Sequence, residues 1–297
     1  MKKNRSKILI TGSNGFVGKS LIKFLKKKNV VIFRITKKKY DLSKKKDFKK
    51  IFLNFNPDFI VHLASRTVSK KKNEKEDKLQ RKNTFLPVKN LIDNINFCKD
   101  LKKIIFCGSI EEYGNIKTPF KESYKPKPLS SYGLAKYSGY KYVLKKIKKQ
   151  KTKFVWLRPS LMFGPNDNNN RFLGSIFYNL KNNTRIHIQL GSQIRDYLFV
   201  EDFCKIIYEE VLFFKSKNYN LLNVSSGNWI LLKDLLSLLK KKIPKNKFCF
   251  LITNKSYDKS KLINSSTLFK KIYPKFKFTP FNISLNKTII SYGFKIN

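Results

Sequence analysis

One short stretch limits the fold of this chain more than any other. The segment ITGSNGFVG, residues 10–18, follows the apolar run KILI and leads into the amphipathic run KSLIKFLKKK. It places Gly12, Gly15 and Gly18 at the spacing GxxGxxG. A strand that passes through such a glycine loop into a helix is typical of a parallel sheet covered by helices.

The three glycines predict a dinucleotide-binding loop. Gly12 permits a tight turn, Gly15 lets the backbone approach a diphosphate, and Gly18 lets the helix pack closely on the strand. The positive end of the helix dipole then faces the anion. We therefore expect cofactor contacts from the whole loop, which also contains Asn14, Phe16 and Val17.

Short apolar runs alternate with amphipathic stretches through the first half of the chain. Strands are expected at 7–12, 30–36, 58–65, 102–109 and 154–165, and helices at 18–28, 47–55, 79–100 and about 130–150. This alternation predicts an α/β fold with a doubly wound parallel sheet, as in Rossmann domains. The polar run KKKNEKEDK, residues 70–78, is expected to be a mobile surface loop.

The regular alternation fades after residue 165, and this change predicts two domains. We expect a dinucleotide-binding domain over 1–160, with about 193–218 returning to it. A smaller, mixed α/β substrate domain is expected over 161–192 and 219–297.

Charge and composition exclude several classes of protein. Lys+Arg of 65 against Asp+Glu of 19 gives 65 − 19 = +46, but the lysines run through every segment and no nucleic-acid module accompanies them. We expect no dedicated nucleic-acid partner, although a cofactor-binding scaffold with RNA affinity stays an alternative. No apolar run approaches the ~18 residues of a membrane span, so we expect a cytoplasmic protein without a membrane partner. The scattered cysteines and two histidines predict no metal site.

The end of the second strand bears on the choice between NAD and NADP. An acidic residue there would bind the ribose 2′-hydroxyl of NAD. This chain instead has Arg34, Thr36 and Lys37, with no acid before Asp41. The basic residues favour the 2′-phosphate of NADP, and NAD stays the alternative because lysine is common everywhere. Asp41 and Leu42 are expected near the adenine.

A candidate proton relay lies further along the chain. Tyr132 and Lys136 are four residues apart on an expected helix, so their side chains share one face. A tyrosine with an ordinary pKa near ~10 needs a nearby cation to exchange protons at neutral pH, and Lys136 supplies one. Ser109 ends the strand KKIIFCGS, where ligands bind in such sheets. These three residues are predicted to be catalytic. Tyr132 and Lys136 are also expected to contact the cofactor, with Lys136 holding its ribose.

With these motifs the sequence resembles the extended short-chain dehydrogenase/reductase family, in particular its NAD(P)-dependent nucleotide-sugar epimerases, dehydratases and reductases. The resemblance rests on TGSNGFVG, PDFIVHLAS, GSIEEYG, YGLAK, LRPSLMFGP and GSQIRDYLFVEDF, and it covers nearly the whole chain. It implies a nucleotide-sugar substrate and, as is common among relatives, a homodimer.

The resemblance also implies roles for further residues. Leu63, Ala64 and Ser65 would border the cofactor. Arg195 would grip the diphosphate of the nucleotide sugar, although an ion pair with Asp196 is the alternative. The resemblance also implies that Arg171 and Phe172 contact the nucleotide base of the substrate.

The kind of reaction depends on the residues after Ser109. Sugar dehydratases need an acid directly after the catalytic hydroxyl residue, and this chain has Ile110 at that position. Glu111, the next residue, resembles the base of dehydratases that use a single glutamate, and it would lie near the substrate. The basic end of the second strand and the chain length resemble the branch of CDP-abequose synthase-like 4-keto-sugar reductases. We therefore expect NADP-dependent reduction of a nucleotide-linked 4-keto-6-deoxy sugar for surface-polysaccharide precursor synthesis. The alternatives are a nucleotide-sugar 4-epimerase, similar to UDP-glucose 4-epimerase, and a 4,6-dehydratase.

Overall fold

The computed structural model of the chain describes residues 5–67, 73–147, 152–189, 193–213, 219–243, 250–253 and 260–296. The chain folds into two compact units. Unit 1 contains 1–116, 122–159 and 203–223, and unit 2 contains 117–121, 160–202 and 224–297. The last stretch of unit 1 therefore begins and ends later than the expected 193–218, and the roles assigned to the two predicted domains stay predictions.

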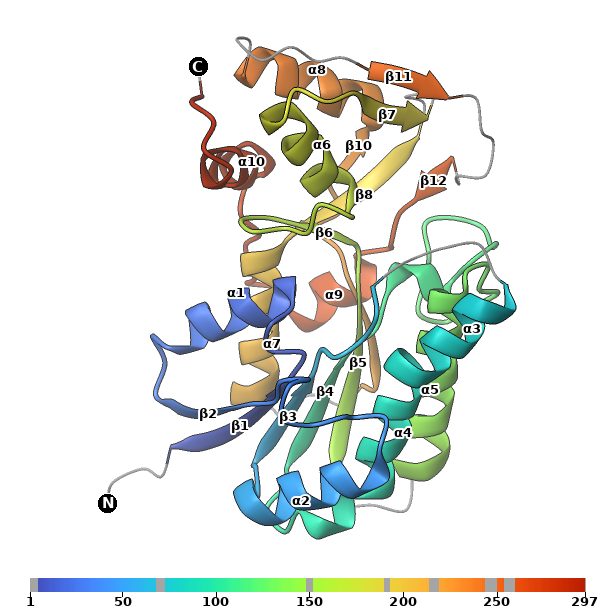
Figure 1. The fold of residues 1–297 in the computed structure, drawn as a ribbon, viewed down its shortest axis with the longest axis vertical. Helices are drawn as coiled ribbons and strands as arrows, with labels where there is room; N and C mark the ends of the chain where they lie inside the picture. The colour runs from blue at the N-terminus through green and yellow to red at the C-terminus, as the bar shows by residue number, and fades with distance from the viewer. Residues whose placement is uncertain are drawn as a thin grey trace. The chain divides into compact units, whose positions relative to one another are not determined.

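Unit 1 is built on a six-stranded sheet in the order β2-β1-β3-β4-β5-β9 (Figure 1). The pairs β1–β2, β1–β3, β3–β4 and β4–β5 are parallel. The strands are β1 (Ser6–Thr11), β2 (Val30–Arg34), β3 (Phe59–His62), β4 (Lys103–Cys107), β5 (Lys153–Pro159) and β9 (Leu221–Val224). The predicted doubly wound parallel sheet is confirmed.

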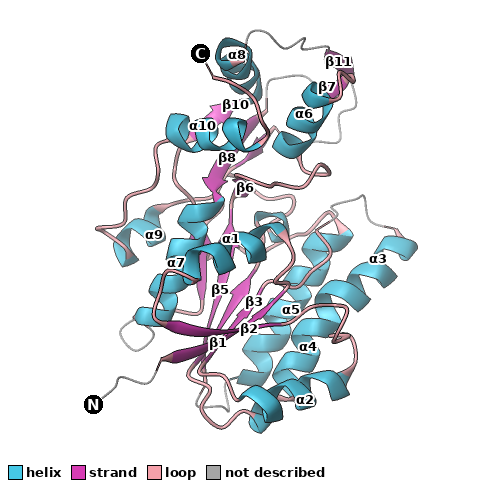
Figure 2. Cartoon of the chain, turned by 60° about the vertical axis from the view of Figure 1, so that its left-hand side comes forward, coloured by secondary structure: helices cyan, strands magenta, loops and turns pink. Residues whose placement is uncertain are grey.

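Helices cover both faces of this sheet, as Figures 1 and 2 show. α1 and α7 lie on one face, and α2, α4 and α5 lie on the other. The helices of this part of the chain are α1 (Phe16–Leu25), α2 (Lys45–Phe55), α3 (Glu74–Gln80), α4 (Leu86–Asp93), α5 (Ser131–Ile147) and α7 (Val200–Leu212). A π-helical turn (Arg81–Phe85) joins α3 to α4, and 3-10 turns span Ile95–Phe97 and Ile110–Glu112.

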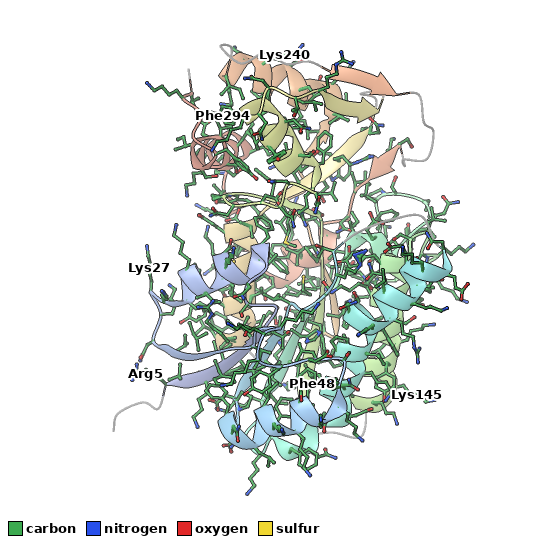
Figure 3. All side chains as sticks on the ribbon, in the orientation of Figure 1. Arg5, Lys27, Phe48, Lys145, Lys240 and Phe294 are labelled. Atoms are coloured by element: carbon green, nitrogen blue, oxygen red, sulfur yellow. The ribbon has the colours of Figure 1, made fainter. Side chains whose placement is uncertain are left out.

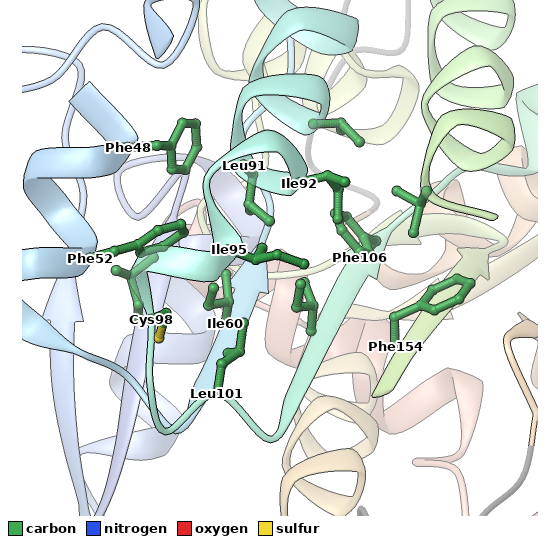
Figure 4. Packing of buried hydrophobic residues seen from close by; sticks show 14 of the residues in the cluster. Phe48, Phe52, Ile60, Leu91, Ile92, Ile95, Cys98, Leu101, Phe106 and Phe154 are labelled. Atoms are coloured by element: carbon green, nitrogen blue, oxygen red, sulfur yellow. The ribbon is translucent and has the colours of Figure 1, made fainter. Parts of the chain in front are cut away.

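A large hydrophobic cluster of unit 1 fills the space between the sheet and the α2, α4 and α5 layer (Figure 4). Phe48 and Phe52 enter it from α2, Leu91 from α4, and Phe106 and Phe154 from the strands. All four residues of β3 are buried, as expected for a strand covered on both faces. This packing fixes the carboxyl ends of the strands, where the candidate site lies.

Two local predictions in unit 1 are wrong. Residues 74–78, expected in a mobile loop, begin helix α3, and Asn73 is its N-cap; residues 70–72 of that run lie outside the described residues. The Asn73 side chain accepts a hydrogen bond from Glu76 N at 2.9 Å, which caps the helix, and acidic residues in the first turn suit the helix dipole. The single helix expected over 79–100 is instead divided by the π-helical turn and ends at Asp93.

Unit 2 contains a smaller mixed sheet. β8 pairs in antiparallel fashion with β10 and in parallel with β6 and β12, while β7 and β11 form a separate parallel pair. Its elements are β6 (Leu161–Phe163), α6 (Phe172–Lys181), β7 (Ile186–Gln189), β8 (Ile194–Phe199), β10 (Trp229–Leu231), α8 (Leu232–Lys242), β11 (Phe250–Thr253), β12 (Lys261–Leu262), α9 (Thr267–Ile272) and α10 (Phe281–Ser291). The expected strand 154–165 is therefore two strands in two sheets, β5 and β6, which separate after Pro159.

The basic side chains are spread over the surface of both units. Figure 3 shows Lys27, Lys145 and Lys240 projecting outward from widely separated segments. None of the described helices has the length and apolar composition that crossing a bilayer requires. Among the described residues, the basic side chains thus lie on several separate segments of each unit.

Candidate functional site

The glycine loop between β1 and α1 has the geometry that its sequence predicts. Gly12 has a positive φ of 68°, and a Cβ there would lie 2.7 Å from Ala64 N. A Cβ on Gly18 would lie 2.3 Å from the Gly12 carbonyl oxygen. Both positions therefore require glycine, one for its backbone conformation and the other for the close approach of helix to loop.

Gly15 keeps the space before α1 open. It is the N-cap residue of α1, with extended backbone (φ −74°, ψ 172°), and no side chain caps the helix. A Cβ on Gly15 would lie 3.2 Å from the Gly12 carbonyl oxygen, a tight contact, so glycine also suits this position. The helix N-terminus is thus suited to receive a diphosphate. Asn14 is exposed beside it, and Phe16 and Val17 are half-buried.

A basic side chain borders this loop at the carboxyl end of β2. The exposed Arg34 donates from Nη2 to Asn14 Oδ1 at 3.2 Å, which brings its guanidinium beside the glycine loop. The half-buried Thr36 and the exposed Lys37 follow. The adenosine end of a dinucleotide is expected here.

Asp41, the first acid after β2, has local partners. Its Oδ1 accepts hydrogen bonds from Ser43 N at 3.0 Å and Ser43 Oγ at 2.7 Å, and these bonds lower the pKa of Asp41. The following residue, Leu42, packs against the core of unit 1 and its carbonyl accepts from Asn90. The carboxylate of Asp41 thus stabilises its own turn.

The segment after β3 is held against the glycine loop. Thr11 Oγ1 lies 3.0 Å from His62 Nδ1 and accepts a hydrogen bond from Ala64 N at 3.2 Å. Leu63 and Ala64 are half-buried beside Gly12, and the half-buried Ser65 follows them. Burial, with the nearby Lys136 cation, lowers the pKa of His62 to about 3, so this imidazole is neutral.

Tyr132 and Lys136 lie one turn apart at the start of α5, and both are buried. Lys136 Nζ lies 5.8 Å from the centroid of the Tyr132 ring and donates to the Cys107 carbonyl oxygen at 2.6 Å. This bond fixes the ammonium at the carboxyl end of β4. Burial lowers the pKa of Lys136, and the negative charge of Glu112 opposes that shift.

Ser109 follows β4 and caps the 3-10 turn. Its Oγ accepts from Glu111 N at 3.2 Å, and Glu111 Oε2 accepts from Ser130 Oγ at 3.3 Å. A Cβ on Gly133 would lie 2.4 Å from the Glu111 carbonyl oxygen, so the turn and the start of α5 are in close contact. Elements of unit 1 thus bring the predicted trio of Ser109, Tyr132 and Lys136 to one place. Their catalytic roles stay predictions.

The other predicted substrate residues lie in unit 2. Arg171 precedes α6, with its Nε 2.8 Å from Asp167 Oδ1, and Phe172 packs against the core of that unit. Arg195 is buried in β8 and donates to the Ile194 carbonyl oxygen at 3.0 Å. Its neighbour Asp196 accepts a hydrogen bond from Ser160 Oγ. Substrate contacts of Arg171, Phe172 and Arg195 therefore stay predictions.

Comparison with known proteins identifies the family. The NAD dependent epimerase/dehydratase family matches residues 8–225, which include the glycine loop and the predicted trio. The chain belongs to this family. The predicted relationship to NAD(P)-dependent nucleotide-sugar enzymes of the extended short-chain dehydrogenase/reductase type is thereby confirmed.

Members of the family with several activities are similar to this chain. ADP-L-glycero-D-manno-heptose-6-epimerase of Brachyspira hyodysenteriae is 25% identical, covering 74% of this chain and 76% of the relative. GDP-6-deoxy-D-talose 4-dehydrogenase of Aggregatibacter actinomycetemcomitans is 31% identical (68% and 69%). dTDP-4-dehydro-6-deoxyglucose reductase of Escherichia coli is 28% identical (82% and 84%). Epimerases and keto-sugar oxidoreductases are thus both represented.

The fold is similar to that of a solved structure. UDP-glucose 4-epimerase of Thermus thermophilus, in complex with NAD, has a TM-score of 0.84 to this chain at 17% identity. The match covers 97% of this chain and 99% of the other.

Proposed function

We propose that this chain uses NADPH to reduce the 4-keto group of a nucleotide-linked 4-keto-6-deoxy sugar. The position of Arg34 carries the proposal. Its guanidinium lies beside the glycine loop, where an NADP 2′-phosphate is expected, while the carboxylate of Asp41 is engaged by Ser43. NADPH suits a net reduction, whereas a 4-epimerase restores its cofactor in each cycle. Two relatives, a 4-dehydrogenase and a 4-dehydro-sugar reductase, support the same class of substrate.

In this proposal Ser109, Tyr132 and Lys136 deliver the proton to the substrate. When bound, the cofactor supplies the hydride that reduces carbon 4. Tyr132 donates its phenolic proton to the oxygen that was the keto group, and Lys136, fixed on the Cys107 carbonyl, stabilises the phenolate that remains. Ser109 Oγ donates a hydrogen bond to the same substrate oxygen and orients it.

A nucleotide-sugar epimerase is the second candidate, and the similarity to the heptose epimerase favours it. A dehydratase has less support. Ile110, at the position where a dehydratase acid is expected, is buried, and Glu111 is held by Ser130 at the start of α5.

We also expect a homodimer, which sedimentation of the purified protein would test.

Cofactor oxidation with defined substrates tests the proposal. The purified protein would be mixed with NADPH and 4-keto-6-deoxy sugars carried on CDP, dTDP, GDP or UDP, and the absorbance of the reduced nicotinamide followed. We expect oxidation with at least one of these sugars. Tyr132→Phe should lower kcat by about 10²- to 10⁴-fold with an unchanged Kd for NADPH, because only the proton donor is removed.

Tyr137→Phe is the matched control, since Tyr137 lies on the same helix but outside the proposed relay. It should retain activity. Interconversion of UDP-hexoses without net NADPH oxidation, together with no reaction of any 4-keto sugar, would replace the proposal by the epimerase.

A further inference from the structure

A buried carboxylate lies directly behind Ser109, and the proposed proton relay does not use it. Glu112 is fully buried at the end of the 3-10 turn. Its Oε1 accepts hydrogen bonds from Ser109 N and from Trp156 Nε1, both at 2.8 Å, and its Oε2 accepts from Arg158 Nε at 2.8 Å. One carboxylate thus joins the Ser109 backbone to two side chains of β5.

The charge of this carboxylate is compensated by Arg158. The Arg158 side chain is 1% exposed, and its guanidinium lies 4.5 Å from the centroid of the Tyr113 ring and 5.2 Å from that of Tyr140. Tyr113 in turn donates its hydroxyl hydrogen to Asn223 Oδ1 at 2.7 Å. The ion pair is therefore enclosed by side chains of β5, of α5 and of Tyr113, which is itself hydrogen-bonded to β9.

The backbone at the end of β4 is built around this carboxylate. A Cβ on Gly108 would lie 2.6 Å from Glu112 Oε1 and 2.3 Å from Trp156 Nε1. Gly108 N also donates to the Leu157 carbonyl oxygen at 2.7 Å, which continues the pairing of β4 with β5. Glycine at this position lets the Glu112 carboxylate and the Trp156 ring meet directly behind Ser109.

We propose that Glu112 is a positioning residue, which fixes the backbone and hence the hydroxyl of Ser109 and holds a negative charge near the buried Lys136 ammonium. The inference rests on the proposed function, because it assigns Glu112 a role in the same proton relay. Among the described residues, Lys136 interacts electrostatically with His62 of β3, Cys107 of β4 and Glu112 of the 3-10 turn, and its Nζ lies over the ring of Tyr132 of α5.

Glu112→Gln tests the positioning role. The amide keeps the size of the side chain but removes its charge and weakens its hydrogen bonds to Ser109 and Arg158. We expect kcat to fall about 10- to 100-fold, the range for loss of a group that orients a reacting residue, with an unchanged Kd for NADPH. The alkaline limb of the kcat–pH profile should move to lower pH, because the Lys136 ammonium loses its proton more readily without the negative charge of Glu112.

Glu210→Gln is the matched control. Glu210 is also fully buried and ion-paired, with Lys103 Nζ at 2.6 Å, but Lys103 begins β4 while Ser109 follows its other end. This variant should lose stability in thermal unfolding, with kcat and the pH profile unchanged. A pH profile that moves equally in both variants would show a general effect of losing a buried charge and overturn the positioning role.

Trp156→Phe keeps the inference testable if Glu112→Gln does not fold. It removes one donor to Oε1 and leaves the ion pair with Arg158. A fall in kcat of about 2- to 10-fold with unchanged NADPH affinity supports the positioning role. An unchanged kcat overturns it.

The two proposals can fail separately. An active Tyr132→Phe variant would contradict the proposed function. An inactive Tyr132→Phe variant together with a fully active Glu112→Gln variant would contradict only the role of Glu112.

Discussion

The ion pair between Lys103 and Glu210 gives a quantitative test of the interior of unit 1. Lys103 Nζ lies 2.6 Å from Glu210 Oε2, and the two side chains are 2% and 0% exposed. Glu210 also accepts a hydrogen bond from the Tyr219 hydroxyl. Glu210→Leu would leave the ammonium buried without its carboxylate, which costs about 3 to 5 kcal/mol of unfolding free energy. The midpoint of thermal unfolding should then fall by roughly 6 to 20 °C.

A double-mutant cycle separates the ion pair from other effects of substitution. Lys103→Met with Glu210→Leu replaces both charges by apolar groups, so the double variant should lie within about 1 kcal/mol of the original chain or be more stable. Urea unfolding of all four proteins, followed by circular dichroism, supplies the free energies. A single variant that loses less than about 1 kcal/mol, or a double variant whose loss equals the sum of the two, would refute the reasoning.

Two further predictions concern the cofactor and pH. Arg34→Asp should lower kcat/KM for NADPH by about 10- to 100-fold, because a cationic partner of the 2′-phosphate is replaced by a repelling charge. The value of kcat/KM for NADH should stay equal or rise. An unchanged ratio of the NADPH and NADH values in steady-state kinetics would contradict the assignment of Arg34. Burial raises the pKa of Asp196 from 3.8 to about 6, so the folded state binds this proton more tightly than the unfolded state. Stability should fall as pH rises from about 4 to about 6, by on the order of 3 kcal/mol from this group, and Asp196→Asn should remove that part of the slope in urea unfolding at several pH values.

The sheet was predictable because its inner strands are buried on both faces and read as short apolar runs. β3 and β4 are almost entirely buried, so their sequences carry little polar interruption. The error over 70–78 has a different origin. The run is polar throughout, and its composition alone predicts a loop, whereas the helix start depends on the Asn73 cap, which accepts from Glu76 N three residues later. That signal is present in the sequence as an Asn followed at the third position by Glu.

The candidate site was predictable where side-chain chemistry follows a fixed spacing. Tyr132 and Lys136 are one helical turn apart, and the three glycines have fixed positions in the loop. The partner of Lys136 is a backbone carbonyl, that of Cys107, and no sequence pattern marks a carbonyl as an acceptor. Glu112 was unpredictable for a related reason: two adjacent glutamates in GSIEEYG look alike, and only the fold shows that Glu111 reaches Ser130 while Glu112 points to β5.

The arginines carry information in a chain whose default cation is lysine. Arg158 makes contacts of two kinds at once, a hydrogen bond from Nε to Glu112 and cation–π contacts with aromatic rings, of which the Tyr113 centroid lies 4.5 Å away. A planar guanidinium can satisfy both, because its N–H groups lie in the plane and its faces stay free for an aromatic ring. A lysine ammonium in that space has one charged atom and no face to stack. Only eight of the 65 basic residues are arginine, so an arginine in this chain indicates a specific contact, as at Arg158, whereas the net charge indicates none. Arg158 is paired with Glu112, and Glu112 in turn holds the backbone of Ser109.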